Sequence, residues 1–543
     1  MSNLQSTVPV PKNEPVLNYR PGSPETKALK KQLADFEGSP IEIPIVINGE
    51  ELRTGKTAAL RAPHNKSLEL GTFHQAGTKE VQAAIEGSQK ALQEWSRFSA
   101  DARASIFLKA GELLAGKYRP ILNAATMLGQ SKTAHQAEID SACELIDFFR
   151  FNVAFQKQLY SIQPESAPGM WNRLQYRPLE GFVFAVTPFN FTSIGGNLPT
   201  APALMGNVVL WKPASTSVYS AYFTLKLLEE AGLPPGVIQF LPGRGAEVGN
   251  PVLESDKLAG IHFTGSTDVF QHMWQTVGSN IQRYKSYPRI VGETGGKDFV
   301  FAHASADRKA LVTALVRGAF EYQGQKCSAA SRAYIPKSVW TAIKEELTAE
   351  VESIRLGDIS DFRNFMGAVI DAASFEKLRG FIEGARKDPN AEIVVGGNCD
   401  DKQGYFVSPT IIEAKKPDYI TMQEELFGPV LTVYVYDDSK FEQTLSLCDK
   451  TSPYGLTGCI FAQDRAAVDR ASSVLEHSAG NFYINNKPTG AVVGQQPFGG
   501  SRASGTNDKA GSLFNLVRWV SMRTVSETFA PPTDYRYPYM EAE

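Results

Sequence analysis

The chain has 543 residues, of which 42% are hydrophobic and 21% are charged, a composition typical of a soluble globular protein and not of a disordered or fibrous one. Its 55 Lys and Arg residues against 58 Asp and Glu residues give a formal net charge of -3. Because the basic residues form no dense tract, we expect no nucleic-acid partner, and small-molecule chemistry is the favoured class of function.

Cysteine usage and the N-terminal segment bear on location. The five cysteines are scattered and form no CxxC pair, a pattern typical of a reducing compartment (Cys143, Cys327, Cys399, Cys448 and Cys459). The segment 1–15 has neither an apolar signal region nor an Arg-rich amphipathic face, and no run of about 18 apolar residues occurs. We therefore expect no membrane partner, and a cytoplasmic location if the source is bacterial or, alternatively, the mitochondrial matrix.

The first 160 residues divide into two parts. Residues 1–40 hold six of the 32 prolines, which predicts an extended N-terminal arm that lies along a surface or a partner. From Thr78 to about Tyr160 apolar residues recur at spacings of three and four, which predicts several amphipathic helices.

Two alternations of strands and helices follow. From Gly181, the apolar runs GFVFAVTPF, NVVLWKP, VIQFLP, IHFTGS and RIVGETGG are separated by helical stretches, which favours right-handed crossovers and a mainly parallel sheet. A second alternation extends to about residue 500. The segment 516–529 alternates like a strand, and we interpret it as able to pair with the edge of another subunit.

Three residues are candidates for catalysis. Cys327 lies in the polar segment EYQGQKCSAASR beside Lys326, where partial exposure and positive surroundings would favour a thiolate nucleophile. Glu293 ends a predicted strand, where a carboxylate can act as a general base. Asn190 also follows a strand, and its amide can donate to a developing oxyanion. Taken singly, each has an ordinary alternative: a free loop cysteine, a solvated glutamate and a turn asparagine.

Other segments suggest a nucleotide cofactor. Lys212 ends a predicted strand, from which its ammonium group can reach ribose hydroxyls or phosphate oxygens. Gly265 and Ser266 close a strand and open a helix, where backbone N–H groups favour a pyrophosphate. In EELFGPV, Glu425 can accept from ribose hydroxyls and Phe427 can cover a ring. None of the seven histidines forms an HxH or HxxxH pair, so we expect no metal.

The order of these segments is more specific than any one of them. TPFNF, WKPA, FTGS, ETGGK, the loop cysteine, EELFGPV and PFGG together resemble the aldehyde dehydrogenase superfamily, from about residue 35 to the C-terminus. The resemblance implies two doubly wound α/β domains with parallel sheets, one of them a Rossmann-type cofactor domain, and a small β oligomerisation element of at least a homodimer. We expect the NAD-binding domain at 41–160 and 181–294, the catalytic domain at 295–503, and the oligomerisation element at 161–180, as a hairpin, with 504–543.

The resemblance also implies a chemistry for the candidate residues. Cys327 would attack an aldehyde carbon to form a thiohemiacetal, with Asn190 and the Cys327 N–H as the oxyanion hole. Glu293 would activate the water that hydrolyses the resulting thioester. NAD would be held by Lys212, Gly265, Ser266, Glu425 and Phe427. Many NAD-preferring relatives carry a glutamate where this chain has Ser215, so a 2′-phosphate is less firmly excluded here.

Three stretches, 187–202, 322–332 and 493–509, resemble the branch of the superfamily that oxidises L-glutamate γ-semialdehyde to L-glutamate in proline catabolism. The resemblance implies that the substrate carboxylate is bound by the Ser328 hydroxyl and by the N–H groups of Gly490 and Ala491. Phe191 and Phe498 would flank the aliphatic chain. Neutral donors at one end would thus fix the substrate while Cys327 meets the aldehyde at the other.

Three alternatives remain open from the sequence. The first is an aldehyde dehydrogenase for another small carboxylated aldehyde, such as succinate semialdehyde. The second is a cysteine hydrolase or acyltransferase that works without a nucleotide, although Cys327 has no local histidine partner. The third is a structural or binding protein that keeps the fold without the activity.

Overall fold

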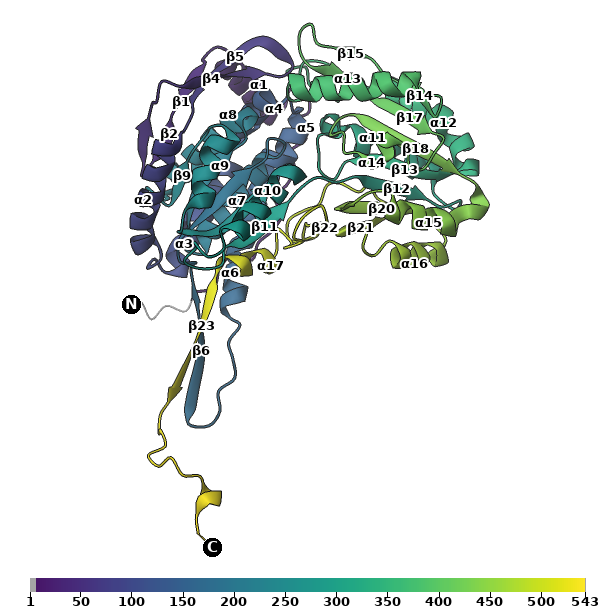
Figure 1. Ribbon diagram of the computed structural model, residues 1–543. Helices are drawn as coiled ribbons and strands as arrows, with labels where there is room; N and C mark the ends of the chain where they lie inside the picture. Colours follow the sequence, from purple (N-terminus) through teal and green to yellow (C-terminus); the bar gives the residue numbers. More distant parts are fainter. Residues whose placement is uncertain (1–5, 543) are drawn as a thin grey trace.

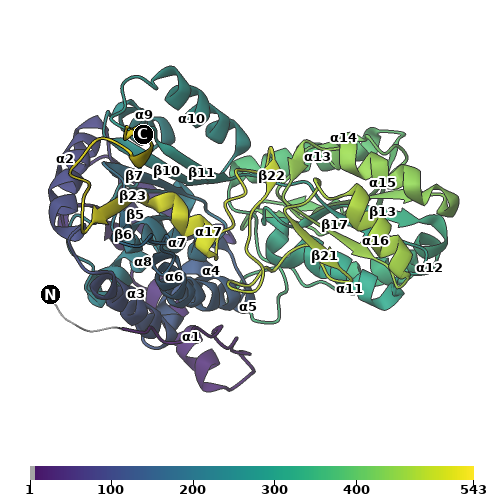
Figure 2. The same ribbon diagram turned by 90° about the horizontal axis from the view of Figure 1, so that it is seen from below.

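Two seven-stranded sheets organise residues 6–542, the part of the chain that this computed structural model describes (Figure 1). Each sheet is covered by helices on both faces and forms the core of one lobe. The segment around β22 and α17 lies between the two lobes (Figure 2). The predicted α/β architecture with two mainly parallel sheets is confirmed.

The first sheet has the strand order β11-β10-β7-β8-β9-β2-β3. The five strands from β7 to β11 run parallel to one another. At the other edge of the sheet, β2 pairs antiparallel with β9, and β3 pairs antiparallel with β2. The parallel strands are buried on both faces, which explains why they are continuous apolar runs in the sequence. Their bounds are β2 (Ile45–Ile47), β3 (Glu50–Leu52), β7 (Phe182–Thr187), β8 (Val208–Pro213), β9 (Ile238–Phe240), β10 (Leu258–Thr264) and β11 (Arg289–Glu293).

Helices bury both faces of this sheet in two hydrophobic cores. One face is covered by α2 (Thr78–Trp95), α9 (Gly245–Glu254) and α10 (Thr267–Ser279). The other face carries α3 (Ala100–Ala115), α4 (Arg119–Gln130), α6 (Leu145–Tyr160), α7 (Thr192–Leu204) and α8 (Val218–Ala231). Between α4 and α6 lie α5 (Ala134–Ala137) and a π-helical turn, Glu138–Glu144, so the predicted helices of 78–160 are confirmed.

The second sheet has the order β14-β17-β18-β13-β12-β20-β21, and only β14 is antiparallel to its neighbour. One face packs on α11 (Arg308–Phe320) and α12 (Lys337–Glu352), the other on α13 (Ala372–Lys387), α15 (Phe441–Lys450) and α16 (Arg465–Val474). The strand bounds are β12 (Asp298–Ala302), β13 (Ala330–Pro336), β14 (Ala391–Val395), β17 (Thr410–Ala414), β18 (Val430–Tyr436), β20 (Thr457–Phe461) and β21 (Asn481–Ile484).

The smaller elements lie around the two sheets. A three-stranded sheet contains β1 (Ile41–Ile43), β4 (Thr57–Ala62) and β5 (Asn65–His74), and two short pairs contain β15 (Cys399–Asp400) with β16 (Phe406–Val407), and β19 (Tyr454–Gly455) with β22 (Ser501–Arg502). The short helices are α14 (Ile420–Gln423), α17 (Leu513–Leu516) and the 3-10 turns Ser215–Ser217, Glu321–Gly324, Asp438–Lys440, Val517–Trp519 and Pro538–Met540. Across the described residues, no helix combines the length and apolarity that a membrane crossing requires.

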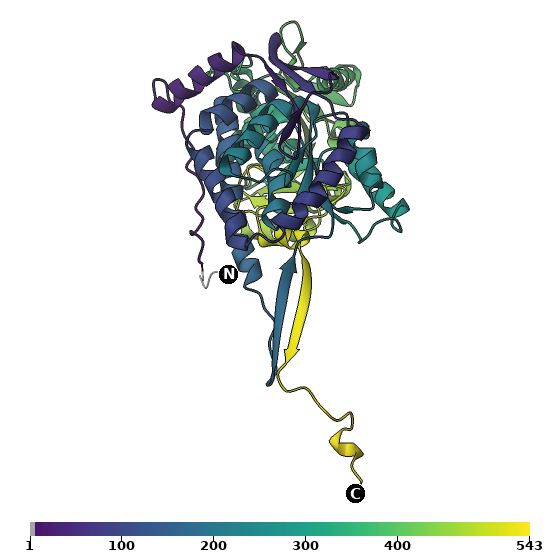
Figure 3. The same ribbon diagram turned by 90° about the vertical axis from the view of Figure 1, so that its left-hand side faces the viewer.

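The N-terminal arm is only partly extended, so the prediction for 1–40 is wrong over residues 24–37. There the chain forms α1 (Pro24–Glu37), with Ser23 as the N-cap residue and Pro24 in the first turn. Proline is compatible with the first helical turn, where its missing N–H has no partner in any case. Leu29 and Leu33 bury the inner face of α1 against the first lobe. Residues 6–20 have no regular secondary structure and extend along the outside of that lobe (Figure 3).

A long two-stranded ribbon extends from the first lobe (Figures 1 and 3). It pairs β6 (Met170–Arg177) with β23 (Ser521–Thr528) in antiparallel register, from Ser521 opposite Arg177 to Thr528 opposite Met170. The prediction of a hairpin inside 161–180 is wrong, because Pro164 and Pro168 fall in the connection before β6 and leave room for one strand. The partner strand comes from the C-terminal segment of the same chain.

Candidate active site

Cys327 lies where two cavities meet. It follows a turn in which Tyr322 and Gln323 adopt left-handed backbone angles, with φ of 52° and 54°. Gln323 stabilises this turn because its amide donates to the carbonyl oxygens of Ser131 and Ala368, at 3.0 Å and 2.8 Å. The Cys327 side chain borders a cleft of about 650 Å³ and also a second cavity of about 350 Å³. A nucleophile at this point can reach ligands in both.

The surroundings of the Cys327 thiol differ from the sequence prediction. Cys327 is only 9% exposed, and burial, together with the nearby carboxyl groups of Asp298, Glu425 and Glu293, raises its pKa well above the ordinary value. The Lys326 ammonium group, expected to supply positive surroundings, instead forms an ion pair with Glu321 at 3.1 Å. The prediction of an electropositive, partly exposed thiol is therefore wrong, and the free thiol is neutral.

Glu293 borders the same small cavity as Cys327. It is the last residue of β11, at the carboxyl end of the strand, and its Oε2 accepts a hydrogen bond from the Gly500 N–H at 3.0 Å. Burial raises its pKa well above the ordinary value, an effect opposed by the Gly500 N–H and the Lys509 ammonium. A carboxyl group with a raised pKa takes a proton more readily, which suits a general base.

Asn190 lies just after β7 and is 3% exposed. Its Nδ2 donates to the carbonyl oxygen of Gln325, two residues before Cys327, at 3.0 Å. An amide nitrogen carries two hydrogens, so this bond fixes the side chain and leaves one donor. Both Asn190 and Cys327 border the larger cleft. The pair can therefore place donors at one oxygen atom of a ligand.

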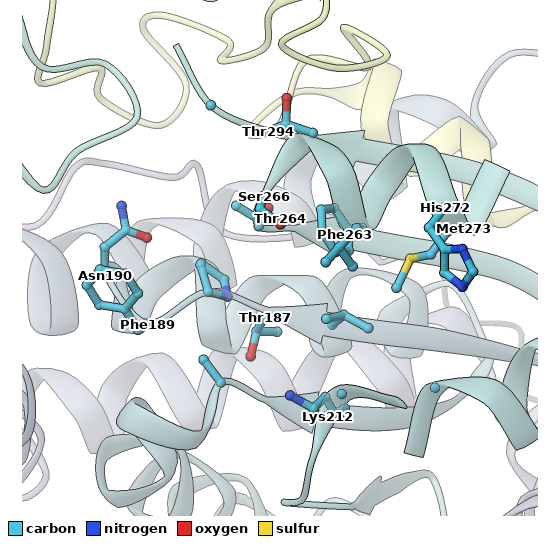
Figure 4. Close-up of a pocket in the computed structure, with 18 of the residues that line it drawn as sticks. Thr187, Phe189, Asn190, Lys212, Phe263, Thr264, Ser266, His272, Met273 and Thr294 are labelled. Atoms are coloured by element: carbon cyan, nitrogen blue, oxygen red, sulfur yellow. The ribbon is translucent and has the colours of Figure 1, made fainter. Parts of the chain in front are cut away.

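The larger cleft runs along the carboxyl ends of the first sheet's parallel strands, as Figure 4 shows. All five residues predicted to bind the cofactor border it: Lys212, Gly265, Ser266, Glu425 and Phe427. Lys212 lies near the carboxyl end of β8, and burial lowers its pKa to about 8. Ser266 is the N-cap residue of α10, and its side chain makes no capping hydrogen bond. The first N–H groups of α10 therefore need other partners.

The cleft fits a dinucleotide. A Cβ atom placed on Gly245 or Gly249, which border the cleft from α9, would meet nothing within 4 Å. The α9 backbone thus faces open space where a ligand can approach closely. With the partly buried Lys212, uncapped N–H groups at the start of α10 and the partly buried Glu425 carboxylate, the cleft offers partners for phosphates and ribose hydroxyls.

Glu425 and Phe427 form the end of the cleft near Cys327. Glu425 Oε1 accepts from the Gly296 N–H at 2.8 Å, and burial raises the pKa of its carboxyl group. Phe427 has a left-handed backbone, with φ of 59°, and its ring contacts that of Phe189 edge-on, with centroids 5.7 Å apart. These two residues come from the second lobe, so both lobes build the cleft.

The smaller cavity collects the residues predicted to bind the substrate. Phe191, Ser328, Gly490, Ala491 and Phe498 all border it, together with Cys327 and Glu293. Ser328 is buried, and its Oγ donates to Thr489 Oγ1 at 2.8 Å. Gly490 follows Thr489 with φ of 96°, a backbone angle that glycine adopts without strain. The wall of this cavity therefore combines the thiol with a hydroxyl group and with the backbone of a glycine-containing loop.

Several residues of this cavity were missed in the sequence. Glu144 borders it from the π-helical turn; burial raises its pKa to about 8, and it accepts from Ser193 Oγ at 2.9 Å. Lys487 borders it too, and its ammonium donates to the Thr489 carbonyl at 2.9 Å. Asn13 and Glu14 reach it from the N-terminal arm. No motif marks these positions, because only the tertiary structure brings them to the cavity.

The described residues contain no cluster of three or more side chains suited to a metal ion.

Comparisons with known proteins agree with this geometry. The chain is 55% identical over 541 residues to a mitochondrial delta-1-pyrroline-5-carboxylate dehydrogenase of Dictyostelium discoideum, covering 99% of this chain and 97% of that protein. It is 50% identical over 530 residues to the mitochondrial enzyme of that name from Mus musculus, covering 97% and 94%. The crystal structure of the delta-pyrroline-5-carboxylate dehydrogenase of Mycobacterium tuberculosis bound with NAD has 54% identity, covers both chains fully and superposes with a TM-score of 0.96.

A sequence profile of the aldehyde dehydrogenase family matches residues 52–525. This match includes the parallel strands of both sheets and every residue predicted to take part in catalysis or in ligand binding. The chain belongs to the aldehyde dehydrogenase family.

Proposed function

We propose that this chain oxidises L-glutamate γ-semialdehyde, the open form of delta-1-pyrroline-5-carboxylate, to L-glutamate with NAD, as the second step of proline catabolism. The observation that carries the proposal is the small cavity, whose wall combines Cys327 and Glu293 with Ser328, Gly490 and Ala491. The names of the relatives and the NAD-bound state of the Mycobacterium tuberculosis enzyme support the substrate and the cofactor.

The first half of the reaction takes place at Cys327. Its sulfur adds to the aldehyde carbon, and the thiol, which burial keeps neutral before attack, releases its proton to solvent as the bond forms. The remaining Asn190 N–H and the Cys327 backbone N–H stabilise the charge on the aldehyde oxygen, a contact worth roughly 3 kcal/mol in the transition state. NAD, when bound by Lys212, Ser266 and Glu425, supplies the two-electron acceptor, and a thioester remains on Cys327.

The second half needs water and a base. Glu293 borders the cavity and its raised pKa suits it to take a proton from a water molecule as that water attacks the thioester. The bond from Gly500 N–H to Oε2 orients the carboxyl group and leaves Oε1 free for this task. Hydrolysis releases L-glutamate and restores the thiol.

The substrate assignment is tested by comparing aldehydes in an assay of NADH formation. We expect kcat/KM to be highest for L-glutamate γ-semialdehyde, lower for succinate semialdehyde and lowest for a neutral aldehyde of similar length. A higher kcat/KM for succinate semialdehyde would replace the proposed substrate with that one. The variant Cys327→Ala should bind NAD in calorimetry but form no NADH; turnover in this variant would exclude Cys327 as the nucleophile.

We propose the following division of the chain. Residues 41–160 and 181–294 form the NAD-binding domain, 295–503 form the catalytic domain, and 161–180 with 504–543 form the oligomerisation element. Its support is that all strands of the first sheet lie within residues 45–293 and all strands of the second within 298–484, while the β6–β23 ribbon belongs to neither.

We also propose that the chain is a homodimer in which the β6–β23 ribbon contacts the partner. Among the described residues the outer edge of β23 pairs with no other strand, and Trp171, Met522 and Phe529 expose large apolar surfaces on the ribbon and at its end. Light scattering should give twice the chain mass for the full chain and the mass of one chain for a truncation after residue 520.

The two relatives described above are mitochondrial by name. We therefore propose that the protein lies in the mitochondrial matrix if its source is eukaryotic, and in the cytoplasm if its source is bacterial.

A further inference from the structure

The N-terminal arm, residues 6–19, reaches the substrate cavity although it lies at the other end of the chain from the carboxylate-binding loop. Asn13, Glu14 and Val16 border the same cavity as Ser328, Gly490 and Ala491. The arm therefore forms part of the cavity wall, and its position bears on the shape of the substrate site.

Asn13 links the arm to the carboxylate-binding loop, residues 489–496. Its Nδ2 donates both to the carbonyl oxygen of Val493 and to Asp147 Oδ2 of α6, each at 2.8 Å. Its Oδ1 accepts from Gln495 Nε2 at 2.9 Å. Both hydrogens and the oxygen of this amide are thus used, and two of the three bonds go to the loop.

The arm itself is firmly attached at this point. Glu14 forms ion pairs with Arg119 and Arg150, each at 2.6 Å, and its backbone N–H donates to Asp147 Oδ1 at 2.7 Å. Farther along, the Leu17 N–H donates to the buried Glu138 at 2.8 Å. These contacts fix the backbone next to Asn13, so the bond from Asn13 to Val493 can restrain the loop.

The loop is restrained at two places. At its start, Thr489 accepts from Lys487 and from Ser328. Toward its end, Val493 accepts from Asn13. Gly490 and Ala491, whose N–H groups are assigned to the substrate carboxylate, lie between these two fixed points. Loss of the second restraint would let the two donors move while leaving Cys327 and the cofactor cleft intact.

We propose that Asn13 is a positioning residue that holds the 489–496 loop in the conformation that binds the substrate carboxylate, so that the N-terminal arm contributes to substrate specificity. The proposal rests on the proposed function. It concerns the binding of the carboxylate end and not the chemistry at the aldehyde.

The test compares Asn13→Ala with Asn18→Ala, a matched change at an exposed asparagine of the same arm. For Asn13→Ala we expect KM for L-glutamate γ-semialdehyde to rise about 5- to 10-fold, the effect of losing one partly buried hydrogen bond, with kcat within about 2-fold of wild type. The value of kcat/KM for a neutral aldehyde and KM for NAD should stay within about 2-fold. Asn18→Ala should match the wild type throughout.

Gln495→Ala provides an independent test, because it removes a loop contact of Asn13 while leaving the arm attached through Asp147. It should raise the same KM in part, and combining it with Asn13→Ala should give less than the product of the two single effects. An unchanged KM in Asn13→Ala, or equal losses for the carboxylated and neutral aldehydes, would overturn the proposal. Failure of the wild type to oxidise L-glutamate γ-semialdehyde would instead overturn the proposed function.

Discussion

Replacement of Glu293 by glutamine separates the two halves of the reaction. Glutamine keeps the size of the side chain and can still accept from the Gly500 N–H, so the bond at 3.0 Å and the cavity shape survive the change. What is lost is the ability to take a proton. A positioned general base contributes roughly 10²- to 10⁴-fold, so steady-state NADH formation by Glu293→Gln should fall by about that factor.

Rapid mixing of the enzyme with NAD and substrate measures the two halves separately. If Glu293 acts only on water, Glu293→Gln should still produce a burst of NADH equal to the concentration of active sites and then stall as the thioester. The control is Glu424→Gln, the same chemical change at an exposed carboxylate close to the cleft, which should turn over normally. A burst slowed as much as the steady state would refute the assignment, because Glu293 would then be needed before the thioester forms.

The raised pKa of Glu293 also gives this prediction a pH dependence. The carboxyl group acts as a base only when ionised, and burial moves its ionisation to higher pH than for an exposed glutamate. Where thioester hydrolysis limits the wild type, kcat should therefore rise as pH rises through this pKa. Glu293→Gln should lack that rise.

Three further predictions concern the cavity and the cleft. Ser328→Ala removes a hydrogen bond to a charged group, worth about 1.5–3 kcal/mol, so kcat/KM for L-glutamate γ-semialdehyde should fall roughly 10- to 100-fold and that for a neutral aldehyde far less. Ser331→Ala, outside the cavity, is its control, and equal losses for both aldehydes would contradict the carboxylate assignment. Ser215→Glu should lower kcat/KM for NADP much more than for NAD, since a carboxylate repels a 2′-phosphate; parallel losses would exclude this position from cofactor choice. Glu144 has a pKa of about 8 in the folded chain, above its unfolded value, so wild-type stability should fall relative to Glu144→Gln as pH rises from about 5 to 8, by up to about 1.4 kcal/mol per pH unit; a constant difference in thermal unfolding would contradict this.

Much of the fold could be predicted because its signals are local. The runs that form β7, β8 and β10 are mostly apolar, since parallel strands between two layers of helices are buried on both faces. The glycine and serine after β10 mark the start of α10 for a similar reason: the backbone must turn and its N–H groups face outward. Such features depend on neighbours within a few residues, which a sequence displays directly.

Three features could not be predicted because they depend on residues far apart in the chain. The helix α1 was missed since prolines were counted as breaking regular structure, whereas Leu29 and Leu33 have a hydrophobic surface to pack against. The partner of β6 is β23, which comes from the C-terminal segment of the chain. The bond from Asn13 to the Val493 carbonyl likewise joins the two ends of the sequence.

The sequence by itself determined the α/β architecture, the family and the residue types available for the chemistry, because strand patterns and the order of motifs are properties of the chain alone. Only the tertiary structure decided the electrostatic state of Cys327. Lys326 is its neighbour in sequence but pairs with Glu321, and the carboxyl groups of Asp298, Glu425 and Glu293 come from other strands and loops. The charge that a buried thiol experiences depends on distance in space, and folding sets that distance.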